Sequence, residues 1–232
     1  MRIDVLTIFP EAFPGPLAVG VVGRALAAGQ VSVSAHDLRD FTEDRQRQVD
    51  DTPFGGGPGM VLKPEPIIRA VRRFREERPS IRTILLSPQG RLFTQEVARE
   101  LALHQDILLV CGRYQGVDER ARQEIGEELS VGDFILSGGE IGAMAVIEAV
   151  ARLVPGTVGS PESLVDETFS SEGFEPPLYT RPAEFDGREV PAVLRGGDHA
   201  AIQRWHREQR DTSTRRQPAN LVRSGSVTGG QQ

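Results

Sequence analysis

Three short apolar runs that each end in a glycine-bearing loop place the strongest constraint on the fold. Residues 81–86 precede Ser-Pro-Gln-Gly, residues 107–110 precede Cys-Gly, and residues 129–136 precede Ser-Gly-Gly. Short apolar runs are typical of strands that are buried on both faces of a sheet. In open α/β sheets, ligands bind beyond the carboxyl ends of the strands, where glycine lets the backbone approach them closely. We therefore expect the three loops to form one ligand pocket.

Strands and helices alternate along the rest of the chain up to residue 154. Further strands are expected over residues 3–9 and 31–37, and helices over residues 17–28, 64–78, 94–103, 117–128 and 140–154. This order predicts an α/β fold with a mostly parallel sheet and helices on both of its faces. The last helix is apolar nearly all round, so we expect it to be buried inside the fold or between subunits.

Composition narrows the class of protein. The chain has 232 residues, of which 38% are hydrophobic and 26% charged, and it contains no apolar run long enough for a membrane span. It begins on a strand-like segment without a signal-peptide pattern, so we expect a cytoplasmic protein without membrane contact. The single cysteine, Cys111, excludes internal disulfides and cysteine-rich zinc sites. Because Cys111 stands at the end of an expected buried strand, we expect it to be a core residue rather than a nucleophile.

The C-terminal part differs in composition. Residues 155–177 are rich in proline, glycine, serine and acids, which indicates a linker or a long functional loop, and we expect it to be disordered in the free protein. Residues 178–221 contain eight arginines against six acids, whereas residues 1–177 carry a net charge of −9. A helix is expected over residues 199–210, and residues 222–232 should be a disordered tail.

Other motifs limit the chemistry. Residues 40–51 are almost wholly polar and are expected to be a solvated loop. Residues 50–60 contain four glycines and two prolines but match neither a P-loop nor a dinucleotide fingerprint, so a flexible linker and a shaped functional loop both remain open. The four histidines are scattered and no metal-ligand motif is present, so we expect no dedicated metal site. A glycine-lined pocket with Arg152 near its rim favours a cofactor-dependent transferase.

Seven stretches occur in the order of a known family. They are IDVLTIFP (3–10), VDDTPFGGGPGM (49–60), LSPQG (86–90), VCGRYQGVDER (110–120), SVGDFILSGGEIGAM (130–144), YTRP (179–182) and EVPAVL (189–194). On these stretches the chain resembles the bacterial tRNA (guanine-N1)-methyltransferases, the TrmD family of the SPOUT superfamily. The resemblance implies methyl transfer from S-adenosylmethionine to N1 of the guanosine 3′ of the anticodon, tRNA position 37, in a Mg²⁺-dependent reaction.

The resemblance also implies an architecture. It implies a C-terminal trefoil knot in the α/β fold, a small α-helical C-terminal domain that helps hold tRNA, and a homodimer with active sites at the subunit interface. We therefore expect a cofactor-binding knot domain over residues 1–160, a linker over 161–177, a tRNA-binding domain over 178–221 and a tail over 222–232.

The family's cofactor positions map onto the three glycine-bearing loops. The residues expected to contact S-adenosylmethionine are Leu86, Ser87, Pro88, Gly90, Gly112, Tyr114, Val131, Gly132, Asp133, Phe134, Ile135, Leu136, Gly138 and Gly139. Asp50 matches a family acid and is expected in the substrate pocket. Arg181 is a candidate tRNA phosphate contact.

Methylation of guanine N1 requires a base, because this nitrogen carries a proton at neutral pH. The resemblance implies a carboxylate on the inter-domain segment as the base and an arginine that stabilises charge on O6. Arg152 matches the arginine. The chain reads Val-Asp-Glu-Thr-Phe at residues 165–169, where the family commonly has Asp-Ser-Phe, so Glu167 is the expected base and Asp166 the alternative.

Two other functions remain open from the sequence. A non-catalytic RNA-binding or regulatory protein could use the same scaffold, because Glu167 departs from the family's aspartate. A methyltransferase of this fold could also act on another RNA position, although the YTRP segment and Arg152 favour the tRNA (guanine-N1) subfamily.

Overall fold

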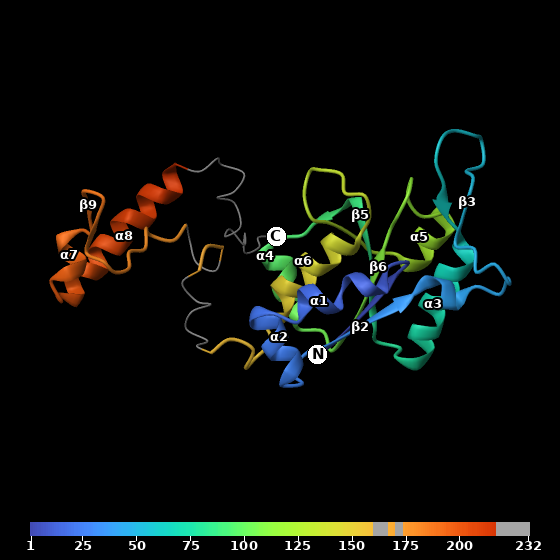
Figure 1. Ribbon diagram of the computed structural model, residues 1–232, viewed down its shortest axis with the longest axis horizontal. Helices are drawn as coiled ribbons and strands as arrows, with labels where there is room; N and C mark the ends of the chain where they lie inside the picture. The colour runs from blue at the N-terminus through green and yellow to red at the C-terminus, as the bar shows by residue number, and fades with distance from the viewer. Residues whose placement is uncertain (160–166, 170–173, 217–232) are drawn as a thin grey trace, which may run out of the picture. The chain divides into compact units, whose positions relative to one another are not determined.

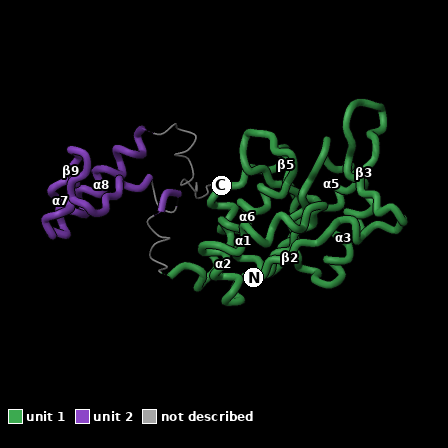
Figure 2. Tube along the Cα trace, in the orientation of Figure 1, with its two compact units in different colours: residues 1–159 green, residues 160–232 purple. Residues whose placement is uncertain are grey.

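The computed structural model describes residues 1–159, 167–169 and 174–216. The chain divides into two compact units, residues 1–159 and residues 160–232 (Figure 2). Disorder was expected at residues 155–177 and 222–232, and of these, residues 160–166, 170–173 and 222–232 lie outside the described residues. Within the described part, none of the helices combines the length and the apolar character that a membrane span requires.

Unit 1 is built on a five-stranded parallel sheet (Figure 1). The strand order is β2 (Ser32–Asp37), β1 (Arg2–Thr7), β6 (Asp106–Cys111), β5 (Arg82–Leu92) and β7 (Glu128–Ser130). The prediction of a mixed α/β fold with a mostly parallel sheet is confirmed.

Helices cover both faces of this sheet. On one face, α1 (Pro14–Leu17), α2 (Gly20–Ala27), α4 (Gln95–Ala102) and α6 (Glu140–Ala151) contribute to one core. On the other, α3 (Pro64–Glu77) and α5 (Glu119–Ile125) contribute to a second core. Alternate residues of β6 enter the two cores: Leu109 joins the first and Leu108 the second. This alternation explains why the central strands read as continuous apolar runs.

Two strands differ from the expectation. The apolar run over residues 129–136 is strand only as far as Ser130, after which the chain leaves the sheet and exposes Phe134 and Ile135. Strand β5 does not end at Leu86 but continues to Leu92, with a register shift against β7 between Leu86 and Arg91. Hydrophobicity predicted the buried strand cores but not their ends, because apolar side chains also line the loops beyond them.

Helix α6 is buried on one side only. Val146, Ile147 and Val150 enter the core, whereas Ile141 is 61% exposed and Glu148 is also exposed. A helix that packs on one face of a sheet keeps an outer side, so unit 1 by itself buries only one side of this helix. Burial of the other side between subunits stays a prediction.

The polar and glycine-rich segments before α3 are anchored at their ends. A 3₁₀ helix (η2, Leu38–Phe41) occupies the start of the expected solvated loop, and Arg47 pairs with Asp40. The glycine-rich loop leaves from β3 (Asp50–Asp51) and returns at β4 (Val61–Leu62), and these two short strands pair antiparallel. The loop is thus closed at its base rather than a free linker.

Unit 2 contains a hairpin of β8 (Glu184–Phe185) and β9 (Arg188–Glu189), then α7 (Ala192–Arg195) and α8 (His199–Arg215). The predicted helix is confirmed and extends five residues further than expected. Asp198 caps it by accepting hydrogen bonds from the Ala200 and Ala201 N–H groups, both at 3.0 Å. Trp205 packs against Tyr179 of the YTRP segment, with ring centroids 6.3 Å apart.

Asp4 is a fully buried carboxylate in β1. Its Oδ1 lies 2.6 Å from His36 Nε2, and its Oδ2 accepts from Arg78 Nη2 at 2.6 Å. Arg78 also donates to Asp106 at 2.9 Å. Burial alone would raise the pKa of Asp4, but the hydrogen bonds from His36 and Arg78 outweigh it and hold this pKa below its usual range.

We expect Asp4→Asn to lower the free energy of unfolding at neutral pH by about 1–3 kcal/mol, because a buried donor loses its acceptor. A depressed folded-state pKa stabilises the protein above the unfolded-state value of about 3.9, and this contribution is lost as the pH falls through the folded-state pKa. The difference between wild type and variant should therefore shrink in acid. Unfolding measured from pH 7 to pH 3 tests this, with exposed Glu76→Gln in α3 as the charge-matched control. A difference independent of pH would contradict it.

Candidate active site

A cavity of about 360 Å³ lies beside residues 85–89 of β5 and at the carboxyl ends of β6 and β7. Its walls come from the loops after β6 and β7, as the sequence predicted, and from residues 85–89, which lie within β5 and not in a loop after it. Of the fourteen residues expected to contact the cofactor, twelve line it: Leu86, Ser87, Pro88, Gly112, Tyr114, Val131, Gly132, Phe134, Ile135, Leu136, Gly138 and Gly139. The volume falls within the range of about 300–1,000 Å³ that is typical of small-molecule sites.

Gly90 and Asp133 are not among the lining residues. A Cβ at Gly90 would lie 2.5 Å from the backbone of Glu128 and Leu129, so this glycine permits the close pairing of β5 with β7. Asp133 is exposed on the loop after β7. The contacts of all fourteen residues with a cofactor stay a prediction.

The loops after β6 and β7 meet at their glycines. Gly139 N–H donates to the Gly112 carbonyl at 2.9 Å. A Cβ at Gly139 would lie 2.7 Å from Cys111 Cα and 3.0 Å from Gly112 N, so no larger residue fits there without moving β6. The chain returns to β6 at this point and enters α6, which fixes one wall of the cavity.

Cys111 lies beneath this wall as a core residue, as predicted. It is 3% exposed, and burial raises the pKa of its thiol well above the usual range, with a further rise from the nearby Glu140 carboxylate. A thiol of this kind is a poor nucleophile at neutral pH.

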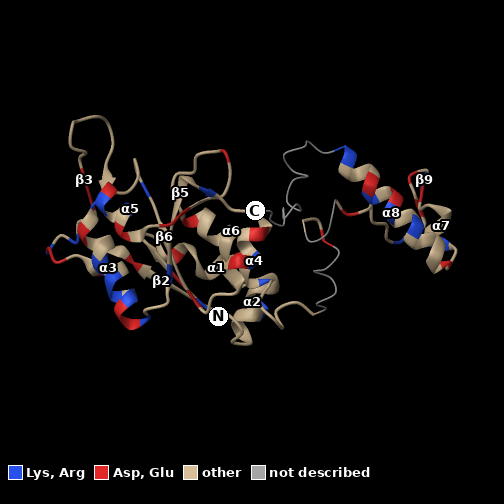
Figure 3. Ribbon diagram, turned by 180° about the vertical axis from the view of Figure 1, so that it is seen from behind, with Lys and Arg blue, Asp and Glu red and all other residues tan. Residues whose placement is uncertain are grey.

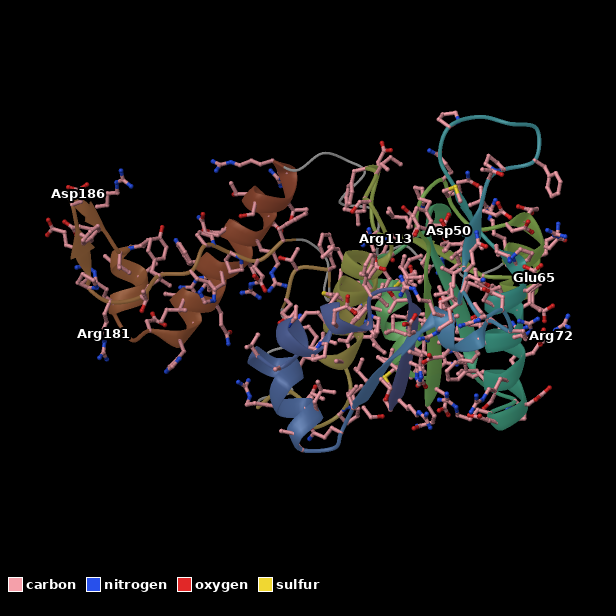
Figure 4. The ribbon with its side chains drawn as sticks, turned by 45° about the vertical axis from the view of Figure 1, so that its right-hand side comes forward. Asp50, Glu65, Arg72, Arg113, Arg181 and Asp186 are labelled. Carbon is pink, nitrogen blue, oxygen red and sulfur yellow. The ribbon has the colours of Figure 1, made fainter. Side chains whose placement is uncertain are left out.

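The glycine-rich loop is joined to the turn that follows β6. Gln115 N–H donates to the Met60 carbonyl at 3.0 Å, and Leu62 N–H donates to the Gly116 carbonyl at 3.0 Å. A Cβ at Gly59 would lie 2.7 Å from Gln115 Cγ, so the two segments are in close contact. Asp50, the expected substrate residue, is half-buried at the base of this loop (Figure 4).

Several lining residues were missed from the sequence. Gln89, Arg113, Gln115, Arg122 and Ser137 also line the cavity. Arg113, Gln115 and Ser137 stand inside the motifs CGRYQG and LSGGE, and their place in these motifs is the signal that could have identified them. Arg122 comes from α5 and donates to Glu128 and to Gln89, a long-range arrangement that no local pattern indicates.

The residues expected to carry the proton chemistry belong to different units. Arg152 is half-buried at the C-terminus of α6, where Thr157 Oγ1 donates to its carbonyl at 3.1 Å. Glu167 is half-buried and Arg181 exposed, both in unit 2. Asp166 lies outside the described residues. Because each unit is described by itself, the assembly of these residues into one site stays a prediction.

The fold and the pocket define a class of protein: a parallel α/β protein with a cavity of small-molecule size at the carboxyl edge of its sheet. The family model for tRNA (guanine-1)-methyltransferase TrmD matches residues 1–224 of this sequence. The chain belongs to this family.

Individual relatives agree over nearly the whole chain. The tRNA (guanine-N(1)-)-methyltransferase of Dictyoglomus turgidum is 48% identical over 228 residues, which cover 98% of this chain and 92% of the relative. Its counterpart from Chloroflexus aurantiacus is 51% identical over 231 residues, covering 98% and 90%. That from Syntrophotalea carbinolica is 51% identical over 209 residues, covering 90% and 85%. These relatives are named as enzymes, which favours catalysis over a non-catalytic RNA-binding role.

Proposed function

We propose that this chain transfers a methyl group to N1 of the guanosine 3′ of the anticodon, tRNA position 37, with S-adenosylmethionine bound in the cavity beside β5 and after β6 and β7. One observation carries the proposal: in a member of this family, twelve residues expected at the cofactor gather around one cavity of suitable size.

The cavity suits the cofactor in its chemistry. Leu86, Leu129 and Val131 offer apolar walls for a flat ring, and the glycine loops offer backbone amides and carbonyls for its polar groups. When bound, S-adenosylmethionine supplies the electrophilic methyl group. The protein's tasks are to hold the guanine N1 in line with it and to remove the N1 proton.

Glu167 is the proposed base for the N1 proton, and Asp166 is the alternative. Arg152 is proposed to stabilise the negative charge that develops on O6 as the proton leaves. The half-buried position of Arg152 supports this role, because a cation shielded from water stabilises a nearby charge more strongly.

Mg²⁺ remains an expectation from the family. Among the described residues, no group of three or more histidine, cysteine, aspartate or glutamate side chains is placed to hold a metal ion. No step of the reaction is assigned to the ion.

The partners proposed are tRNA and a second copy of the chain, in the cytoplasm. The exposed outer side of α6, with Ile141, supports a homodimer. Unit 2 is proposed as the tRNA-holding domain, because Arg204, Arg207 and Arg215 are exposed on α8. Acidic residues also lie along this helix (Figure 3). The return of the chain from β7 to the end of β6 at Gly139 supports the proposed trefoil knot.

Two tRNA transcripts that differ only at position 37 test the function. With labelled S-adenosylmethionine, we expect methyl transfer to the transcript with guanosine and none to the one with adenosine, because adenine carries a 6-amino donor in place of the O6 acceptor that Arg152 is proposed to contact. Transfer to both transcripts, or to neither when the cofactor is bound, would contradict the proposed function.

A further inference from the structure

Glu140, the first residue of α6, is a buried carboxylate beside the pocket. The proposed chemistry gives it no role. Only 4% of its side chain is exposed. Thr7, at the end of β1, donates from its hydroxyl to Glu140 Oε1 at 2.7 Å. Arg113, after β6, donates from Nε to Oε2 at 3.1 Å, and its Nη2 lies 3.1 Å from the same oxygen. A buried charge is costly unless it is paired, so this position depends on both partners.

Phe9 completes a closed network of contacts around Glu140. Phe9 N–H donates to Thr7 Oγ1 at 3.0 Å, and the Arg113 guanidinium lies over the Phe9 ring, with Cζ 4.6 Å from the centroid. This network of contacts joins the end of β1, the loop after β6 and the start of α6. In a low-dielectric interior, linked polar contacts of this kind strengthen one another and fix a single geometry.

Gly138 shows that the ion pair is built into the pocket wall. A Cβ at this position would overlap Arg113 Nε and lie 2.5 Å from Glu140 Oε2. The ion pair therefore occupies the space that a side chain at residue 138 would need. Gly138 and Arg113 both line the cavity and form a β-bridge (Figure 4 labels Arg113).

We propose that Glu140 is a positioning residue for S-adenosylmethionine, which acts through Arg113 and Thr7 on the loops that carry Gly112, Gly138 and Gly139. The inference rests on the proposed function, because that function places the cofactor in this cavity. Small displacements of positioned groups can cost about 100-fold in reaction rate. We expect a loosened wall to weaken cofactor binding as well.

We expect Glu140→Gln to raise the Kd of S-adenosylmethionine by about 10- to 100-fold. The amide keeps the shape and can accept from Thr7, but it lacks the charge that holds Arg113. Isothermal titration calorimetry without tRNA measures the effect. The Kd for tRNA, measured without cofactor, should change less than about twofold, because no proposed tRNA contact involves this ion pair.

A matched control separates positioning from general loss of stability. Asp4→Asn breaks another buried ion pair on β1, with Arg78, and Asp4 does not line the cavity. We expect both variants to lower the Tm and only Glu140→Gln to weaken cofactor binding. Equal weakening in both variants, or binding by folded Glu140→Gln as tight as in wild type, would overturn the inference.

Two further variants keep the inference testable. If Glu140→Gln does not fold, Thr7→Val provides the test, because it removes only the hydroxyl that Thr7 contributes to the network. We expect folded Thr7→Val to bind the cofactor more weakly than wild type. Unchanged binding would overturn the inference. Arg113→Gln combined with Glu140→Gln should bind about as weakly as the weaker single variant, since the two residues act as a unit. Additive losses would overturn the proposed route through Arg113.

A failure of the proposed role of Glu140 can be distinguished from a failure of the proposed function. If the wild-type protein binds the cofactor but methylates no tRNA, the proposed function is wrong. The positioning role of Glu140 can still be tested by the same calorimetric titration of the cofactor. Wild type that does not bind the cofactor would overturn both.

Discussion

Glu167→Gln is expected to lower kcat for methyl transfer to tRNA by about 10²–10⁴-fold, the contribution typical of a well-placed general base. The amide matches the carboxylate in size but cannot accept the guanine N1 proton. The Kd of S-adenosylmethionine should remain near the wild-type value, because Glu167 lies in unit 2 and the cavity is formed by unit 1. Single-turnover assays with saturating cofactor and tRNA measure the chemical step separately from binding.

Two companion variants decide between the neighbouring acids. Asp166→Asn removes the adjacent carboxylate and should retain most activity. Glu167→Asp shortens the side chain by one methylene and restores the residue common in the family, so it should keep much more activity than Glu167→Gln. If Asp166→Asn is the inactive variant and Glu167→Gln is active, the base is Asp166 and the alignment of this segment is wrong by one residue.

Gly139→Ala should have the second large effect. The φ angle of Gly139 is −75°, which alanine adopts without strain, so the whole effect comes from the 2.7 Å approach of the new Cβ to Cys111 Cα. Because backbone atoms form the contact, the loop must move away from β6. We expect a loss of about 1–3 kcal/mol in the free energy of unfolding. The Kd of S-adenosylmethionine should rise at least about tenfold, as measured by calorimetry.

Gly142→Ala is the matched control, one turn further along α6. A Cβ there would lie 3.5 Å from side-chain atoms of Leu86 and Val131, which is ordinary contact. Alanine also favours the helix by up to about 1 kcal/mol over glycine. We expect this variant to be as stable as wild type or more so. If Gly139→Ala and Gly142→Ala behave alike, the close approach at Gly139 is not what shapes the pocket.

The sequence predicted the parallel sheet and most of the pocket because both depend on local patterns. The central strands are buried on both faces, so they read as apolar runs, and parallel strands bring their carboxyl ends to one edge. Twelve of the residues that the family resemblance implied at the cofactor line this cavity. The predictions were wrong where an apolar residue served a loop instead of a strand, as at Phe134 and Ile135, which are exposed beyond β7.

One glycine of the predicted set is packed against a strand and does not line the cavity. Gly90 belongs to the same motif as Ser87, yet it lies against the backbone of β7 instead of lining the cavity. A motif shows that a residue is constrained but does not distinguish contact with a ligand from contact with the next strand.

The sequence by itself determined the fold class, the pocket-forming loops and the family, because hydrophobic periodicity and motif order are properties of neighbouring residues. Only the tertiary structure decided that Glu140 meets Thr7 and Arg113, which lie 133 and 27 residues away. Only the tertiary structure likewise decided that Gly138 and Gly139 are fixed by contacts with Arg113 and Cys111. The physical reason is that these contacts depend on strand order and on the path back from β7 to β6, which no local pattern records.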